Sequence, residues 1–234
     1  MNKFILLLVC LGTIISLSSA QRKATKDKST KKEVLKETLT DVDGNVYHTV
    51  KIGKQVWMVE NLKVTRYRNG DPIQNVTDDT KWTNLTTGAY CNYNNDISKS
   101  NTYGRLYNWY AVTDSRKITP KGWHIPTEAE WDVLIKHLGG ESAAGGRMKE
   151  AGFFHWVNPN TAATNETGLT ALPGGFRDYE NGTFSNISDY GYWWSSTEFS
   201  SCLAWYRYLY YGSGSVERYG NDKGVGFSVR CVRD

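Results

Sequence analysis

The sequence predicts an α+β domain that is rich in loops, and two observations carry this prediction. Segments before residue 140 place apolar residues at helical spacing. From residue 168 onward, short strand-like runs alternate with turn signals. A few helices early in the chain and many short strands late indicate an α+β arrangement.

The first elements are expected to be strands. The segment Val46–Ile52 alternates in character, and Gly53 with Lys54 can form a two-residue hairpin turn. A returning strand is then expected over Gln55–Met58. Residues 60–67 are predicted to form a further strand, which a turn of sequence Asn-Gly-Asp-Pro closes.

Two main helices are predicted after these strands. The first covers residues 104–112, where apolar residues share one face. The second starts at a capping box, in which the Thr127 hydroxyl caps a free backbone N–H and the Glu130 carboxylate reaches back. A Gly-Gly pair ends this helix. Its apolar stripe consists of Trp131, Leu134, Ile135 and Leu138.

The last third is expected to be strands joined by turns. Turn signals occur at residues 173–175, 181–182 and 212–214. In residues 204–211, alternation places Tyr206, Tyr208 and Tyr210 on one face of a strand. Residues 215–219 can pair with this strand, and residues 226–232 are predicted to form the final strand.

The N-terminus has the pattern of a secretory signal peptide. Lys3 precedes an apolar run over residues 4–15, and small residues then predict cleavage between Ala20 and Gln21. The run is too short to span a hydrocarbon core of about 30 Å comfortably. We therefore expect a signal peptide over 1–20, a flexible basic linker over 21–40 and one domain over 41–234. The expected product is secreted or held at the cell surface, without a membrane span.

The positive charge of the chain is concentrated in the expected linker. Residues 21–38 carry seven Lys or Arg against three Asp or Glu, and the whole chain has a net charge of +4. The folded part is therefore close to neutral. Because a nucleic-acid binder concentrates positive charge on its folded module, no nucleic-acid partner is expected. A monomeric domain is expected.

Three cysteines remain after the predicted cleavage, which also removes Cys10. In an oxidising compartment, one disulfide and one free thiol are the simplest outcome. We expect a Cys202–Cys231 disulfide and a free Cys91, although connectivity does not follow from sequence alone. No C-x-x-C motif is present and the histidines are scattered, so zinc is not expected.

Six motifs occur in order along the chain: GKQVWMVENLKVTRYRNGDPI, YGRLYNWYAV, GWHIPTEAEWDVL, LTALPGGFRDYENGTF, WWSST and GFSVRCVRD. In the same order, they resemble those of the Fibrobacter succinogenes major paralogous domain family. The resemblance covers about residues 41–234. Two segments within these motifs, PTEAEW and GFSVRCV, are also distantly similar to sulfatase-modifying, formylglycine-generating enzymes. That similarity implies a C-type-lectin-like fold, with two main helices and several short antiparallel strands.

The residues favour binding over catalysis. Formylglycine-generating enzymes use a close pair of thiols for copper, and Cys202 has no cysteine near it in the sequence. No G-x-S-x-G motif occurs, and Asp178 and Glu180 are ordinary turn residues. Calcium remains open as a cofactor, because residues 94–96 and the pair Asp178 and Asn181 are rich in oxygen atoms. The same residue types are also typical of plain turns, which is the interpretation we favour.

The expected function is a non-catalytic binding module for a glycan or a surface protein. Exposed aromatic rings make stacking platforms for either ligand. Three alternatives stay open: rings that fill a core, an enzyme of the formylglycine-generating superfamily with unrecognised chemistry, and a structural surface component. The candidate ligand-binding residues are Tyr206, Arg207, Tyr208, Tyr210 and Arg218.

Overall fold

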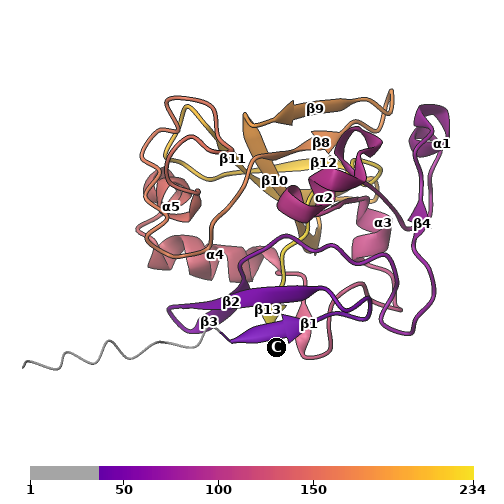
Figure 1. The fold of residues 1–234 in the computed structure, drawn as a ribbon, viewed down its shortest axis with the longest axis horizontal. Helices are drawn as coiled ribbons and strands as arrows, with labels where there is room; N and C mark the ends of the chain where they lie inside the picture. Colours follow the sequence, from indigo (N-terminus) through magenta and orange to yellow (C-terminus); the bar gives the residue numbers. More distant parts are fainter. Residues whose placement is uncertain (1–36) are drawn as a thin grey trace, which may run out of the picture. The chain divides into compact units, whose positions relative to one another are not determined.

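The computed structural model describes residues 37–234, which are coloured in Figure 1. The predicted signal peptide, its cleavage between Ala20 and Gln21, and nearly all of the predicted linker lie outside the described residues. The described part is a mixed domain with more strands than helices. Among these residues, no helix is long and apolar enough to cross a membrane.

The first sheet joins the beginning of the domain to its end. Its strand order is β1-β2-β3-β13-β7, and every neighbouring pair is antiparallel. The C-terminal strand β13 lies between β3 and β7. In Figure 1 it is the yellow strand among the indigo strands. The bounds are Thr38–Thr40 for β1, Val46–Ile52 for β2, Gln55–Met58 for β3, Trp123–His124 for β7 and Val232–Arg233 for β13.

The second sheet comes from the last third of the chain. Its strand order is β12-β11-β10-β8-β9. As predicted, the strand that starts near residue 204 pairs with the next strand across the Gly-Ser-Gly turn. The bounds are Gly174–Arg177 for β8, Phe184–Ile187 for β9, Tyr190–Glu198 for β10, Leu203–Tyr210 for β11 and Glu217–Asp222 for β12.

A third, small sheet and short helices complete the domain. The sheet contains β4 (Gln74–Asn75), β5 (Ala89–Cys91) and β6 (Leu106–Tyr107). The longest helix is α4, which has ten residues. The helices are α1 (Asp79–Thr83), η1 (Tyr93–Asn95), α2 (Ile97–Tyr103), α3 (Trp109–Val112), α4 (Glu128–His137) and α5 (Glu141–Met148).

The capping box that begins α4 is confirmed. The backbone N–H of Glu130 donates to the Thr127 hydroxyl over 3.3 Å, and the Thr127 N–H donates to the Glu130 carboxylate over 2.9 Å. The predicted helix over 104–112 is wrong in its first half, which is strand β6. The side chain of Asn108 accepts from the N–H groups of Ala89 and Ala111. It thereby ends the strand and caps α3.

Of two further predicted strands, the one over 60–67 is absent and the one over 226–232 is much shorter than expected. Residues 60–67 form no strand: Arg66 makes one isolated bridge, to Pro72, and Leu62 N donates to Val229 O over 2.8 Å. Within residues 226–232, only Val232 belongs to a strand. The part before it makes single bridges, from Gly226 to Arg177 in β8 and from Ser228 to Trp193 in β10. The C-terminal segment thus contacts both large sheets.

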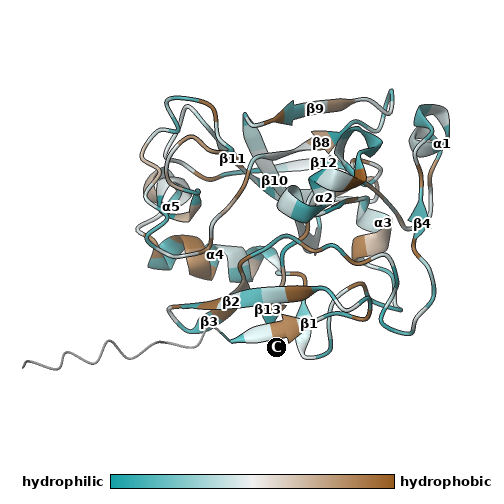
Figure 2. Ribbon diagram, in the orientation of Figure 1, coloured by the Kyte–Doolittle hydropathy of each residue, from teal (hydrophilic) through white to brown (hydrophobic). Residues whose placement is uncertain are grey.

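The core has two main clusters, one on each side of the second sheet. One joins Tyr192, Trp194 and Phe227 with the first sheet and α3. The other joins Trp193 and Leu209 with α4 and α5. Figure 2 shows β10 in pale colours, because its tyrosine, tryptophan, serine and glycine residues lie near the middle of the hydropathy scale.

The predicted Cys202–Cys231 disulfide is not formed, and Cys91, Cys202 and Cys231 are all free. Cys231 directly precedes β13 and is fully buried in the core, whereas Cys202 lies in the exposed loop between β10 and β11. Cys91 is also fully buried. Burial raises the pKa of the Cys91 thiol to about 12, so this thiol stays protonated at neutral pH.

A histidine ties the C-terminal residue to helix α4. His124 Nδ1 lies 2.7 Å from Asp234 Oδ1, and its Nε2 lies 2.7 Å from Glu130 Oε1. Burial by itself lowers the pKa of His124, but the hydrogen bonds to Asp234 and Glu130 outweigh it and leave the pKa raised. Both ring nitrogens donate in the protonated form, which is therefore the form that the fold stabilises.

We expect His124→Asn to destabilise the protein more at pH 5.5 than at pH 8.5. Because the folded-state pKa lies above the unfolded value of about 6.5, the stabilisation is complete below that value. It is lost as the pH rises through the folded-state pKa. The melting temperature at the two pH values, measured for the wild type and for His124→Asn, checks this. An equal decrease at both values would contradict the charged-histidine assignment.

Candidate functional site

The second sheet carries a set of tyrosines on one face. The alternation predicted for β11 is confirmed: Tyr206, Tyr208 and Tyr210 are partly exposed, while Arg207 and Leu209 between them are buried. Register places Tyr190 and Tyr192 of β10 opposite Tyr210 and Tyr208, and Tyr219 of β12 opposite Tyr206. We call this set the tyrosine face; its members are Tyr190, Tyr192, Tyr206, Tyr208, Tyr210 and Tyr219.

The rings of the tyrosine face pack against one another. Tyr190 stacks on Tyr210 with centroids 4.6 Å apart and an interplanar angle of 26°. Tyr208 stacks on Tyr219 at 6.0 Å and 24°. These distances lie in the range of favourable aromatic pairs, which restrict each other's side-chain rotamers. The exposed rings therefore form an ordered surface.

The two ends of the tyrosine face differ in burial. At the inner end, the Tyr192 ring stacks on Phe227 at 5.1 Å and the Tyr206 ring lies 4.7 Å from Phe227. Tyr192 fills the core, as one of the open alternatives predicts, and Tyr206 is partly buried against the core. At the outer end, Tyr208 is partly exposed and Tyr219 is 55% exposed. The outer end is therefore the more accessible part of the face.

A pocket of about 120 Å³ lies at the outer end. The Ser215 hydroxyl donates to Glu217 Oε1 over 2.7 Å, and Ser213 Oγ lies 2.7 Å from Ser215 Oγ. Because a hydroxyl has one proton, Ser213 is the donor to Ser215. Among residues 37–234, no donor contacts Glu217 Oε2. The pocket is lined by Tyr190, Tyr208, Tyr210, Ser213, Ser215 and Glu217.

The phenols of Tyr206 and Tyr208 are neutral at physiological pH. Burial raises the pKa of Tyr206 to about 12. Burial, followed by the nearby Glu217 carboxylate, also raises the pKa of Tyr208. The hydroxyls therefore act as hydrogen-bond donors and acceptors. Glu217 is the one charged side chain in the lining of the pocket.

Two of the predicted ligand-binding residues lie on the opposite face. The Arg207 side chain is fully buried, and its Nη2 donates to Glu128 Oε2 over 2.7 Å and to Asp132 Oδ1 over 2.5 Å. Arg218 extends over the Trp205 ring, 4.8 Å from its centroid, and its Nη1 lies 3.9 Å from Glu128 Oε2. The structure thus brings together the three predicted tyrosines and separates them from both arginines.

The sequence prediction missed Tyr190, Glu217 and Tyr219. The last two were within reach of the reasoning applied to β11, because residues 215–219 were already expected to pair with it. Alternation along that partner would have placed Glu217 and Tyr219 beside the tyrosines. The place of Tyr190 on this face could not be predicted in the same way, since it depends on the register between β10 and β11.

A buried lysine holds the turn beside the pocket in place. Lys149, the residue that ends α5, is fully buried. Its Nζ donates to the carbonyl oxygens of Thr161, Tyr210 and Ser213 over 2.9, 3.1 and 2.8 Å. Burial lowers the pKa of Lys149 to about 8. Three acceptors match the three protons of the ammonium form, so this form is the one held at neutral pH.

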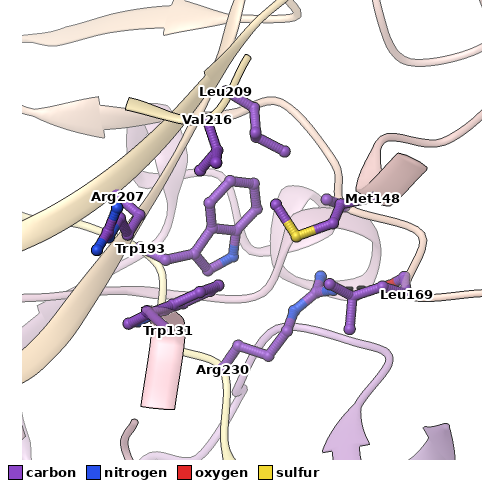
Figure 3. A pocket seen from close by; sticks show the side chains of 9 residues that line it. Trp131, Met148, Leu169, Trp193, Arg207, Leu209, Val216 and Arg230 are labelled. Carbon is purple, nitrogen blue, oxygen red and sulfur yellow. Dashed lines mark hydrogen bonds between the residues drawn. The ribbon is translucent and has the colours of Figure 1, made fainter. Parts of the chain in front are cut away.

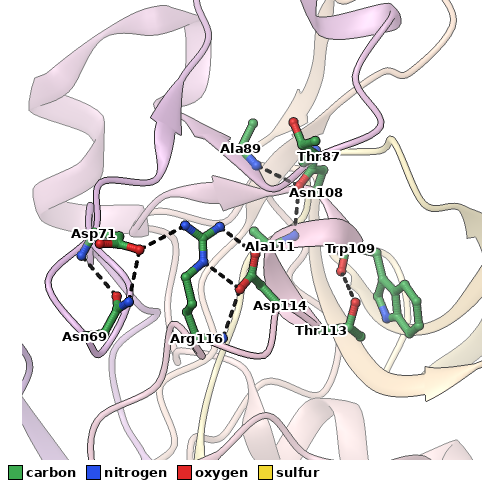
Figure 4. A network of polar contacts seen from close by, with 10 residues as sticks. All are labelled: Asn69, Asp71, Thr87, Ala89, Asn108, Trp109, Ala111, Thr113, Asp114 and Arg116. Atoms are coloured by element: carbon green, nitrogen blue, oxygen red, sulfur yellow. Dashed lines mark hydrogen bonds and ion pairs between the residues drawn. The ribbon is translucent and has the colours of Figure 1, made fainter.

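Two other pockets are less suitable for a ligand than the pocket at the outer end of the tyrosine face. A cleft of about 450 Å³ lies beside Arg116, whose guanidinium is held between Asp71 and Asp114 at 3.2 and 2.8 Å (Figure 4). The charge in this cleft is already paired. An internal cavity of about 10 Å³ between Trp131 and Trp193 has apolar walls (Figure 3). It is at the lower limit for one water molecule.

The oxygen-rich segments that left calcium open serve as turns and caps. Asp178 Oδ1 accepts from the backbone N–H of Glu180 over 2.7 Å, and Asn181 Oδ1 accepts from Thr183 N over 2.9 Å. The Asp96 carboxylate caps α2. Within residues 37–234, no group of three or more His, Cys, Asp or Glu is placed to hold a metal ion.

The comparisons with known proteins give one match. A family model described as Fibrobacter succinogenes major domain matches residues 50–233, which is most of the chain. No curated protein and no solved structure matches. The more distant similarity to formylglycine-generating enzymes, with its C-type-lectin-like fold, stays a prediction.

Proposed function

The chain belongs to the Fibrobacter succinogenes major domain family, and on that premise we propose that it is a non-catalytic module that binds a glycan on its tyrosine face. The family description names neither a ligand nor a reaction. The proposal therefore rests on the surface of this chain. We further propose that the module acts outside the cell, secreted or displayed at the surface, as the N-terminal pattern indicates.

The observation that carries the proposal is the ordered outer end of the tyrosine face. Sugar rings present C–H groups that pack on aromatic faces and hydroxyls that need hydrogen-bond partners. Tyr208 and Tyr219 offer both, as exposed or partly exposed rings stacked 6.0 Å apart, each with a phenol hydroxyl. Glu217 adds an acceptor beside them. This combination suits a polar ring-shaped ligand better than the flat apolar surface of a protein interface.

The enzyme alternative has little support among the described residues. Copper chemistry of the formylglycine-generating type needs two close thiols. Here Cys91 and Cys231 are fully buried and Cys202 is exposed in a loop. The positions of the three thiols therefore favour a binding function over catalysis. A structural surface role would be favoured only if no ligand were found.

We expect the Tyr208→Ala, Tyr219→Ala double variant to bind a glycan at least about fivefold more weakly than the wild type. Two lost stacking contacts of about 0.5–1.5 kcal/mol each give that factor. The measurement is a screen of the purified protein against soluble glycans and cell-wall polymers, followed by calorimetric titration of each ligand found.

Phe154→Ala is the matched control, because Phe154 is 87% exposed and lies outside the tyrosine face. It should bind as the wild type does. The double variant should keep a cooperative thermal transition, which separates lost contact from lost folding. Unchanged affinity in the double variant, or a screen without any glycan ligand, would refute the proposed function.

A further inference from the structure

We propose that the pocket at the outer end of the tyrosine face binds an ammonium group, so that the preferred glycan contains amino sugars with free amines. The glycan part of this inference rests on the proposed function, whereas the ammonium site rests on the pocket itself. Three features of the pocket carry it: its size, its walls and its charge.

The size of the pocket suits one functional group. Pockets that enclose whole small-molecule ligands usually measure about 300–1,000 Å³. This pocket measures about 120 Å³. It can therefore take the end of a ligand whose remainder lies along the exposed rings. An ammonium group is compact enough to enter, while the attached sugar ring stays on the surface.

The walls have the composition that attracts cations. Three tyrosine rings line the pocket, from Tyr190, Tyr208 and Tyr210. The negative face of an aromatic ring attracts a cation within about 6 Å of its centroid. Tyr190 lies 4.6 Å from Tyr210 and 5.8 Å from Tyr208, centroid to centroid, so a group in the pocket is close to several rings at once.

The negative charge of Glu217 also favours a ligand with an ammonium group. Register places Glu217 directly opposite Tyr208, on the tyrosine face. Its Oε1 accepts from Ser215, and within residues 37–234 its Oε2 is without a donor. A carboxylate with one unused oxygen favours a cationic hydrogen-bond donor. It would repel the carboxylates or sulfates of an acidic glycan.

A nearby cation does not occupy the site. Lys149 Nζ contacts the backbone of Tyr210 and Ser213, but all its protons go to three carbonyl oxygens. Lys149 is fully buried and does not line the pocket. Its charge weakens the negative potential of Glu217 without neutralising it by contact. The pocket therefore retains an acceptor for an incoming ammonium group.

The decisive comparison uses two oligosaccharides that differ in one group. At mildly acidic pH, glucosamine oligomers carry ammonium groups, whereas N-acetylglucosamine oligomers of equal length are neutral. We expect the wild type to bind the glucosamine oligomer about tenfold more tightly. In Glu217→Gln this preference should disappear, with the affinity for the acetylated oligomer unchanged. Glu180→Gln, in the turn between β8 and β9, is the matched control and should keep the preference.

Methylammonium chloride is a second probe that needs no glycan. Added to the wild type at constant ionic strength, it should shift the NMR signals of the Tyr208 and Tyr210 rings in a saturable way. The shifts should be absent in Glu217→Gln. Sodium chloride should not reproduce them in any variant.

The outcomes separate the two proposals. Equal affinity of the wild type for both oligomers would overturn the ammonium site and leave glycan binding in place. A preference that survives in Glu217→Gln would overturn it as well. Saturable methylammonium shifts that depend on Glu217, without binding of any glycan, would support the ammonium site and remove the glycan proposal. The absence of these shifts would count against the site whatever the glycans do.

Discussion

Replacing Arg207 by Met should lower the free energy of unfolding by about 3–5 kcal/mol, the range observed when one partner of a buried ion pair is removed. The Arg207 side chain is fully buried and Glu128 is only 10% exposed. Without the guanidinium, the Glu128 carboxylate is left in the interior, where burial already raises its pKa. Asp132 and Glu141 are more than half exposed and contribute little to this loss.

Urea denaturation monitored by circular dichroism measures the effect. Arg218→Met is the matched control, since register pairs Arg218 with Arg207 on the same side of the sheet but leaves its side chain 42% exposed. It should lose less than about 1 kcal/mol. Adding Glu128→Gln to Arg207→Met should restore part of the lost stability, because the orphaned charge is then removed.

The Arg207 prediction also tests where the ligand binds. If Arg207→Met kept its stability and lost glycan binding, the guanidinium would be a ligand contact, as the sequence suggested. We expect the reverse, with the folded fraction of the variant still binding its ligand. Binding should therefore be compared at a low temperature at which both proteins are folded.

Replacing Lys149 by Met should lower the free energy of unfolding by about 3 kcal/mol or more. The carbonyl oxygens of Thr161 and Ser213 would lose their donor in the interior, while that of Tyr210 would keep the backbone N–H of Ser213. An unsatisfied buried polar group costs about 1–3 kcal/mol. In a domain of this size the melting temperature should decrease by about 6–12 °C.

Thermal unfolding of Lys149→Met and of Lys121→Met gives the comparison. Lys121 is exposed, so its removal should change the melting temperature by no more than about 1–2 °C. A decrease in Lys149→Met no larger than in the control would show that the carbonyl groups find other donors. The pocket should also be affected, because Lys149 binds the backbone of Tyr210 and Ser213.

Local signals in the sequence predicted local structure well. The capping box at Thr127 and Glu130 needs only four residues, and the helix begins where it predicts. The alternation through Tyr206, Tyr208 and Tyr210 likewise depends only on the geometry of one strand. The mixed fold with short strands followed from these elements together.

Features that depend on distant segments could not be predicted. Residues 60–67 make only one isolated bridge, at Arg66, and Leu62 bonds to the backbone of Val229, far away in the chain. Cys231 is buried beside the centre of the first sheet because β13 enters between β3 and β7. Arg207 looked like a ligand contact because its sequence neighbours are exposed tyrosines. Its carboxylate partners come from α4 and α5, far away in the chain.

The position of β13 has a consequence for how the domain unfolds. Strand β13 is an interior strand of the first sheet, and the segment before it bridges to the second sheet. Detaching this segment would separate β3 from β7 and break the bridges to the second sheet. We therefore expect the two sheets to lose their structure together, in one cooperative transition.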